Sequence, residues 1–159
     1  MKHIFFILFI SMSLLSFGQK TIPNTEVTTL NGKKAKLYDQ ISKDKITILS
    51  FWATWCVPCI NELDAISEIY EEWQDDLNVE IIAISIDDSR SKKRIKPLIN
   101  GKGWEYKVLI DKNQALKRAL NISVIPHVIV LKDSKILYRH TGYTPGAEEE
   151  LYKKIKELE

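Results

Sequence analysis

The stretch LSFWATWCVPCINEL, residues 49–63, contains both cysteines of the chain, separated by two residues. Residues 46–52 (ITILSFW) are rich in β-branched and aromatic side chains, which predicts a buried strand. After the cysteines, apolar residues recur at helical spacing and predict a helix from about Cys56 to Trp73. Cys56 is therefore expected at the start of a helix that directly follows a buried strand.

Three roles are open to Cys56 and Cys59: a structural disulfide, a pair of metal ligands, or a redox reagent. A disulfide that closes so short a loop stabilises the folded protein by only about 2 kcal/mol, through its restriction of the unfolded chain. A structural zinc site needs about four ligands, and His127 and His140 would complete one only if the fold brought them to the cysteines. Neither of these two roles explains why the pair stands at the predicted start of a helix.

The redox role does explain this position. A thiol at a helix N-terminus faces unpaired N–H groups and the positive end of the helix dipole, and both favour the reactive thiolate. Pro58 suits the first turn of a helix because no N–H donor is needed there. We therefore expect Cys56 to attack a disulfide in a partner and Cys59 to resolve the mixed disulfide.

The first residues of the chain are typical of a secretory signal peptide. A short basic start is followed by a hydrophobic run over residues 4–15 and by small residues at Ser16 and Gly18. We predict a signal peptide over residues 1–18, a mature domain over residues 19–159 and a soluble periplasmic product. The alternative is an uncleaved membrane anchor, although the run is shorter than the roughly 20 apolar residues that span a bilayer.

The charge balance excludes some classes of partner. Lys2 is the only charged residue before Gln19, so the predicted mature domain carries 22 basic and 21 acidic residues. A net charge near zero argues against a role at nucleic acids or membrane surfaces. Export would place the cysteines where disulfides can form. We expect a monomer that needs neither a cofactor nor a metal.

The rest of the chain alternates between strand and helix patterns, which predicts one α/β domain with a partly parallel sheet. The predicted helices are 91–100, bent or ended by Pro97 and closed by Gly101, then 113–120, capped by Asn113, and finally 147–158. The predicted strands are 27–30 and 35–37, which form a hairpin around Asn31 and Gly32, and 79–86, 108–110, 128–132 and 136–140.

With these elements in place, three stretches resemble one known family. FWATWCVPCINEL, IIAISIDD and VLIDKNQALKRALNISVIPHVIVLKDSKILYRHTGY are similar to stretches of the thioredoxin superfamily, and within it of the exported TlpA/ResA-like thiol–disulfide oxidoreductases. The resemblance spans about residues 20–158. It implies a thioredoxin fold, with a central mixed β-sheet flanked by helices, and an N-terminal β-hairpin extension.

The resemblance also implies residue roles. Cys56 and Cys59 form the redox-active disulfide, and Pro126 matches a cis-proline whose loop receives the substrate backbone. Glu62 matches an acidic residue near the active site, where it would act as a general acid or base. Trp52 is expected in the core. The expected substrate-binding residues are Trp55, Val57, Pro58, Ile125, Pro126 and His127.

Two positions depart from the family pattern. Ser50 stands where thioredoxin has a buried aspartate, which leaves Glu62 as the only nearby carboxylate to replace it. His127 follows the proline, where many relatives have threonine, and a histidine there would titrate near neutral pH. Each has a plainer interpretation: Glu62 as a partner of the helix dipole, and His127 as a polar residue at a strand start.

The function expected from these residues is the reduction of disulfides in exported client proteins, such as apocytochrome c, with electrons from a membrane thiol carrier of the DsbD or CcdA type. The same pair could instead serve an oxidant or isomerase. A copper-binding chaperone is a third possibility because thiolates bind Cu(I), although related copper proteins space their cysteines by three residues. The peroxidase pattern Thr-x-x-Cys is absent, since Ala53 precedes Cys56 by three.

Overall fold

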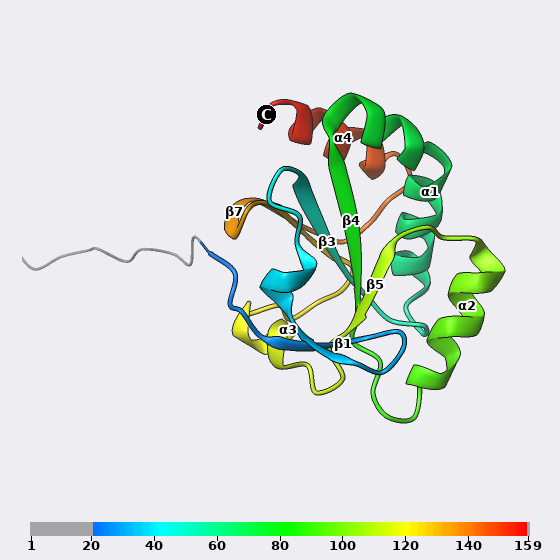
Figure 1. Cartoon of the computed structure of the whole chain (residues 1–159). Coiled ribbons are helices and arrows are strands. Elements are labelled where there is room, and N and C mark those ends of the chain that lie inside the picture. Colours follow the sequence, from blue (N-terminus) through cyan, green and yellow to red (C-terminus); the bar gives the residue numbers. More distant parts are fainter. Residues whose placement is uncertain (1–20, 159) are drawn as a thin grey trace, which may run out of the picture.

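The computed structural model describes residues 21–158, and its central feature is a mixed sheet of seven strands (Figure 1). The strands run in the order β2-β1-β5-β4-β3-β6-β7 across the sheet. Their bounds are β1 Glu26–Thr29, β2 Lys34–Lys36, β3 Ile46–Trp52, β4 Val79–Ser85, β5 Lys107–Ile110, β6 His127–Lys132 and β7 Lys135–Thr141.

The sheet is parallel at its centre and antiparallel at both edges. β3 pairs with β4 in parallel, from Ile46 opposite Val79 to Trp52 opposite Ser85, and β5 continues the parallel part beside β4. Every residue of β3 and β4 is buried, which explains why both strands are mainly apolar in the sequence. The carboxyl ends of β3 and β4 lie side by side at one end of the sheet, and the two cysteines follow β3 there.

Helices cover both faces of the sheet. Figure 1 shows α1, α2 and α4 on one side and α3 on the other. The helices are α1 Val57–Leu77, α2 Ile95–Lys102, α3 Ala115–Ala119 and α4 Ala147–Lys156, with single 3-10 turns η1 Leu37–Gln40 and η2 Lys92–Arg94. α1 places Leu63, Ile66 and Trp73 in the core, at the spacing that predicts the helix. It continues to Leu77, beyond the predicted end.

The predicted fold class is confirmed: the structure is a thioredoxin-like α/β fold with an N-terminal hairpin. The hairpin adds to the main sheet, because β1 pairs antiparallel with β5 as well as with β2. Its turn is longer than a two-residue Asn-Gly turn, since Thr29 N donates to Lys33 O and residues 30–32 lie between them. Gly32 has a φ of 81°, which a residue without Cβ adopts at little cost.

The predicted ends of two helices were wrong. Pro97 neither bends nor ends α2, because it lies in the first turn, where no N–H donor is needed. Gly103, with a φ of 67°, closes this helix, and not Gly101. Asn113 does not cap α3. The carboxylate of Asp111 accepts the backbone N–H groups of Leu116 and Lys117 and performs that role from outside the helix.

The predicted signal peptide, residues 1–18, lies outside the described residues. Among residues 21–158, no helix combines the length and the apolar character needed to cross a membrane.

Candidate redox site

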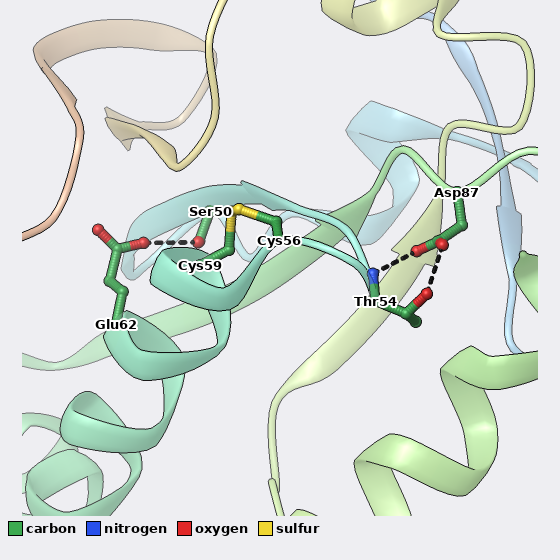
Figure 2. The surroundings of a disulfide bond; sticks show 6 residues. All are labelled: Ser50, Thr54, Cys56, Cys59, Glu62 and Asp87. Atoms are coloured by element: carbon green, nitrogen blue, oxygen red, sulfur yellow. Dashed lines mark hydrogen bonds between the residues drawn. A yellow bond between two sulfur atoms is a disulfide. The ribbon is translucent and has the colours of Figure 1, made fainter.

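Cys56 and Cys59 form a disulfide at the N-terminus of α1, with their Cα atoms 5.3 Å apart (Figure 2). Cys56 is the N-cap residue, in extended conformation, and Pro58 stands in the first turn. Cys59 is completely buried, whereas Cys56 retains 6% exposure. Cys56, the cysteine expected from the sequence to attack, is therefore the more exposed residue of the pair.

Exposed apolar side chains surround this opening. Trp55 is 58% exposed and Val57 is 66% exposed, although both are large and apolar. Trp52, three residues before Trp55, is fully buried, as predicted. The two tryptophans that flank the motif therefore differ: one is part of the core and the other is available to a partner.

The loop before β6 lies at the same end of the sheet as the disulfide. The peptide bond between Ile125 and Pro126 is cis. His127, the next residue, pairs with Phe51 in β3, whose chain reaches Cys56 five residues later. Gly142 N donates to Pro126 O at 2.9 Å and fixes the loop to the end of β7. From the sequence, the position of Pro126 near the cysteine pair was implied only by the resemblance. The register of β3 and β6 places its loop at the same end of the sheet as the pair.

Glu62 is a buried carboxyl behind the disulfide. Its side chain is 3% exposed, and Ser50 Oγ donates a hydrogen bond of 3.2 Å to Glu62 Oε2. Figure 2 shows this contact on the Cys59 side of the disulfide. Glu62 follows Cys59 by three residues in α1, so the two side chains share a helix face. The alternative interpretation of Glu62 as a partner of the helix dipole is weakened by its position in the second turn of α1, because the effect of the dipole falls off within the first turn.

The surroundings of Glu62 favour its protonated form. Burial raises the pKa of Glu62 to about 7, the hydrogen bond from Ser50 opposes this shift, and the negative charge of Glu148 adds to it. A carboxyl with a pKa near neutral pH exchanges protons readily under ordinary conditions. Glu62 is therefore a buried carboxyl that exchanges protons near neutral pH, one helical turn after Cys59 in α1.

His127 does not titrate near neutral pH, contrary to the expectation from the sequence. Burial, with the positive charges of Arg139 and His140, lowers the pKa of His127 to about 4. Its Nδ1 lies 2.7 Å from Thr141 Oγ1, while its buried Nε2 has no hydrogen-bond partner among the described residues. The ring is thus neutral at physiological pH in the oxidised protein.

One polar contact at the site was not predicted from the sequence. The buried carboxylate of Asp87 accepts hydrogen bonds from Thr54 N at 2.9 Å and Thr54 Oγ1 at 2.7 Å (Figure 2). Ser85 Oγ donates a third, at 2.8 Å. Asp87 thereby ties the end of β4 to the loop that leads into Cys56. A polar residue just past a buried parallel strand, beside another such strand, was the signal in the sequence.

No cluster of metal ligands accompanies these residues. Among residues 21–158, no group of three or more histidine, cysteine, aspartate or glutamate side chains is arranged to hold a metal ion. The reactive groups that the site does bring together are the two sulfur atoms and the proton-exchanging carboxyl of Glu62.

Comparison with known proteins agrees with this geometry. The pattern of the AhpC/TSA family matches residues 19–140. The chain belongs to the AhpC/TSA family. Among its relatives, the thiol-disulfide oxidoreductase ResA of Bacillus thuringiensis is 35% identical over 124 residues, which cover 77% of this chain and 69% of that protein. The ResA of Bacillus subtilis is 28% identical over 121 residues, or 76% and 65% of the two chains.

Solved structures of this family's fold are also similar. A thioredoxin-like protein from Porphyromonas gingivalis superposes with a TM-score of 0.76 and 46% identity, over 86% of this chain and 90% of that one. A protein from Chlorobium tepidum described as a thiol:disulfide interchange protein DsbE has a TM-score of 0.74 at 20% identity, over 87% and 94%. The first likeness extends to sequence, whereas the second concerns the fold alone.

The sequence relatives and the disulfide together establish the class of reaction. This member of the AhpC/TSA family is a thiol–disulfide oxidoreductase with a thioredoxin-like fold, related to the ResA proteins. Its substrates are accordingly disulfides or dithiols in other proteins. The resemblance to the thioredoxin superfamily that the sequence suggested is confirmed.

Proposed function

We propose that this protein is an exported reductase that transfers two electrons from a thiol donor at the membrane to disulfides in client proteins. The observation that carries the proposal is the disulfide at the N-terminus of α1, with Cys56 outermost and the buried pair Ser50 and Glu62 behind Cys59. The similarity to ResA proteins supports the thiol–disulfide exchange, and the reducing direction is our inference from the resemblance to the TlpA/ResA-like family. Export rests on the signal peptide predicted over residues 1–18.

The reaction balances as a dithiol–disulfide exchange. The thiolate of Cys56 attacks one sulfur of the client disulfide, forms a mixed disulfide and releases the other client sulfur as a thiolate. Cys59 then loses its proton and attacks Cys56, which frees the second client sulfur. The client gains two electrons and two protons, and the protein is left with its own disulfide. A dithiol carrier of the DsbD or CcdA type would reduce that disulfide again.

Glu62 serves the second step in this proposal. Cys59 is fully buried, so its proton needs a nearby acceptor before the sulfur can attack. Glu62 lies one helical turn further along α1, and its pKa of about 7 leaves part of the population ionised and able to accept that proton. In the reverse half-cycle, the protonated carboxyl returns it to the leaving thiolate of Cys59.

The reduction potential tests the direction of electron flow. A value at or below about −250 mV, measured by equilibration with a thiol buffer, supports a reductase, and one near about −120 mV supports an oxidant and refutes the proposal. Insulin reduction provides the control on residue roles. Cys56→Ser should have no turnover, so continued insulin reduction by this variant would show that the nucleophile is misassigned.

A further inference from the structure

An open cavity lies beside the disulfide, on the side of Trp55. It has a volume of about 220 Å³ and is lined by Trp55, Asp88, Arg90, Ser91 and Arg94. Trp55 directly precedes Cys56 in the chain and is 58% exposed. The cavity thus joins two arginines to the exposed aromatic side chain that directly precedes Cys56, and its volume suits one or two side chains of an extended segment.

The arginines of this cavity are part of a larger cationic surface, here called the basic patch. It consists of five exposed side chains within seven residues, at the start of α2 and just before it: Arg90, Lys92, Lys93, Arg94 and Lys96. The guanidinium of Arg90 is already bound by Asp88, at 3.0 Å. Among residues 21–158, no carboxylate oxygen lies within 4.0 Å of the charged groups of the other four. Most of the patch is therefore available to an external anion.

Charge is segregated on this molecule, although its formal net charge is only +2. A separate group of acidic residues, Glu68, Glu71, Glu72, Asp75 and Asp76, lines another surface hollow on the second half of α1. A helix rises about 1.5 Å per residue, so Asp76 lies about 30 Å from Cys56 along α1. A Debye length of about 8 Å at physiological salt screens that distance, so the acids at the end of α1 do not neutralise the basic patch, and among residues 21–158 Asp88 is the one acid that lines the cavity itself.

We propose that the basic patch and Trp55 dock an acidic segment of the client protein, close in sequence to the client cysteine that forms the mixed disulfide with Cys56. This inference rests on the proposed function, because it needs Cys56 as the attacking sulfur. Arg94 offers its planar fork to a client carboxylate, with which arginine forms paired hydrogen bonds. Trp55 supplies the apolar surface against which the adjacent client chain packs. The patch thereby selects among disulfides by the charge that flanks them.

The test uses three synthetic peptides, each with one disulfide flanked by three glutamates, three glutamines or three lysines. The second-order rate constant for oxidation of the pre-reduced protein by each peptide is measured at low salt and in about 0.5 M NaCl, where surface charges are largely screened. We expect the glutamate peptide to react about tenfold faster than the lysine peptide at low salt, as electrostatic steering provides, and the ratio to approach one at high salt.

Two double variants with equal charge change locate the effect. Lys93→Glu/Arg94→Glu should reverse the order of the glutamate and lysine peptides. Lys132→Glu/Lys135→Glu, at the opposite edge of the sheet, should preserve the wild-type order, because Lys132 pairs with Ile46 at the start of β3. A reversal in both variants would assign the effect to net charge and overturn the docking site.

Equal rates for the three peptides with the wild-type protein would overturn the inference and leave the proposed function standing. If re-reduction by a thiol donor depended on the patch in that case, the partner would be the donor and not the client. Failure of the protein to react with any peptide would overturn the proposed function itself, and the inference with it.

Discussion

Ser50 Oγ donates a hydrogen bond of 3.2 Å to Glu62 Oε2, and both side chains are buried. Ser50 belongs to β3 and Glu62 to α1, the two elements that lie on either side of the cysteine loop. In the sequence these residues are two separate departures, a strand that lacks a carboxylate and a helix that has one. In the fold they lie together, and the carboxyl of Glu62 extends from α1 to the hydroxyl of Ser50 in β3.

Glu62 should make the stability of the protein depend on pH. Its folded pKa of about 7 lies above the ordinary value of 4.5, so the folded state binds more protons than the unfolded state between these limits. Stability from this group is fully present below pH 4.5 and is lost as pH rises towards 7. We compare the free energy of unfolding of Glu62→Gln with that of wild type. We expect this difference to favour the variant by about 3 kcal/mol more at about pH 8 than at about pH 4. Urea unfolding of the oxidised proteins measures this difference.

The matched control is Glu71→Gln, which removes an exposed carboxyl from the same helix. Because this side chain is exposed, its substitution controls for the loss of one negative charge from α1. A change of unfolding free energy with pH that is no larger in Glu62→Gln than in Glu71→Gln would contradict the raised pKa of Glu62.

Ser50 should tune the proton affinity of Glu62. Its hydrogen bond favours the ionised carboxylate, so Ser50→Ala is expected to raise the pKa of Glu62 above the value of about 7. A ¹³C NMR titration of the labelled carboxyl measures the midpoint directly. Ser67→Ala, which alters a hydroxyl elsewhere on α1 that donates to a backbone carbonyl, should leave the midpoint in place. An unchanged midpoint in Ser50→Ala would remove serine from this role.

His127 should act on stability in the opposite sense at acidic pH. Its folded pKa of about 4 lies below the ordinary 6.5, so its contribution is present above pH 6.5 and is lost as pH falls towards 4. Stability of His127→Thr relative to wild type should therefore rise as pH falls through this window. Loss of the contact with Thr141 adds only an offset that does not vary with pH. A difference that stays constant across this window would contradict the buried neutral ring.

The contact between Thr54 and Asp87 should stabilise the loop before Cys56. Thr54→Val removes the hydroxyl donor and leaves a buried carboxylate oxygen without it, at a cost of about 1–3 kcal/mol. The contact involves no sulfur, so we expect the same loss in the oxidised and the reduced protein. Thr28→Val, on β1, is the control of equal shape. A loss no greater than that of Thr28→Val in urea unfolding would contradict the anchoring role.

Cys59→Ser should accumulate mixed disulfides on Cys56, because the resolving thiol is missing. Expression in the native host, followed by non-reducing electrophoresis and mass spectrometry, would identify the trapped clients and donor. Cys56→Ser leaves only the completely buried Cys59 and should trap none of them. Equal trapping by the two variants would reverse the assigned roles.

Much of the fold was predictable because its signals are local. β3 and β4 are buried on both faces and appear as mainly apolar runs, and α1 repeats its apolar residues at helical spacing. The cysteine pair at the junction of β3 and α1 was evident for the same reason. The boundary of α2 was less evident, because Pro97 is allowed in a first helical turn as well as beyond a last one.

The contacts between segments distant in sequence were not predictable. Asp87 meets Thr54 across 33 residues, and only the parallel register of β3 and β4 brings them together. The capping of α3 by Asp111 similarly depends on where β5 ends. The neutral state of His127 depends on its burial in the finished sheet, which periodicity alone does not reveal at a strand's first residue. Long-range packing, and not local pattern, decides these features.

The hydrogen bonds from Thr54 to Asp87 hold the loop before Cys56 in place, and they do not involve the disulfide. When the disulfide opens, a covalent ring is lost, but Thr54 is still held through its backbone and its hydroxyl. The outline offered to other proteins should therefore change little between the two oxidation states. A partner would then distinguish the reduced protein from the oxidised one by whether a mixed disulfide forms, and not by a change of shape.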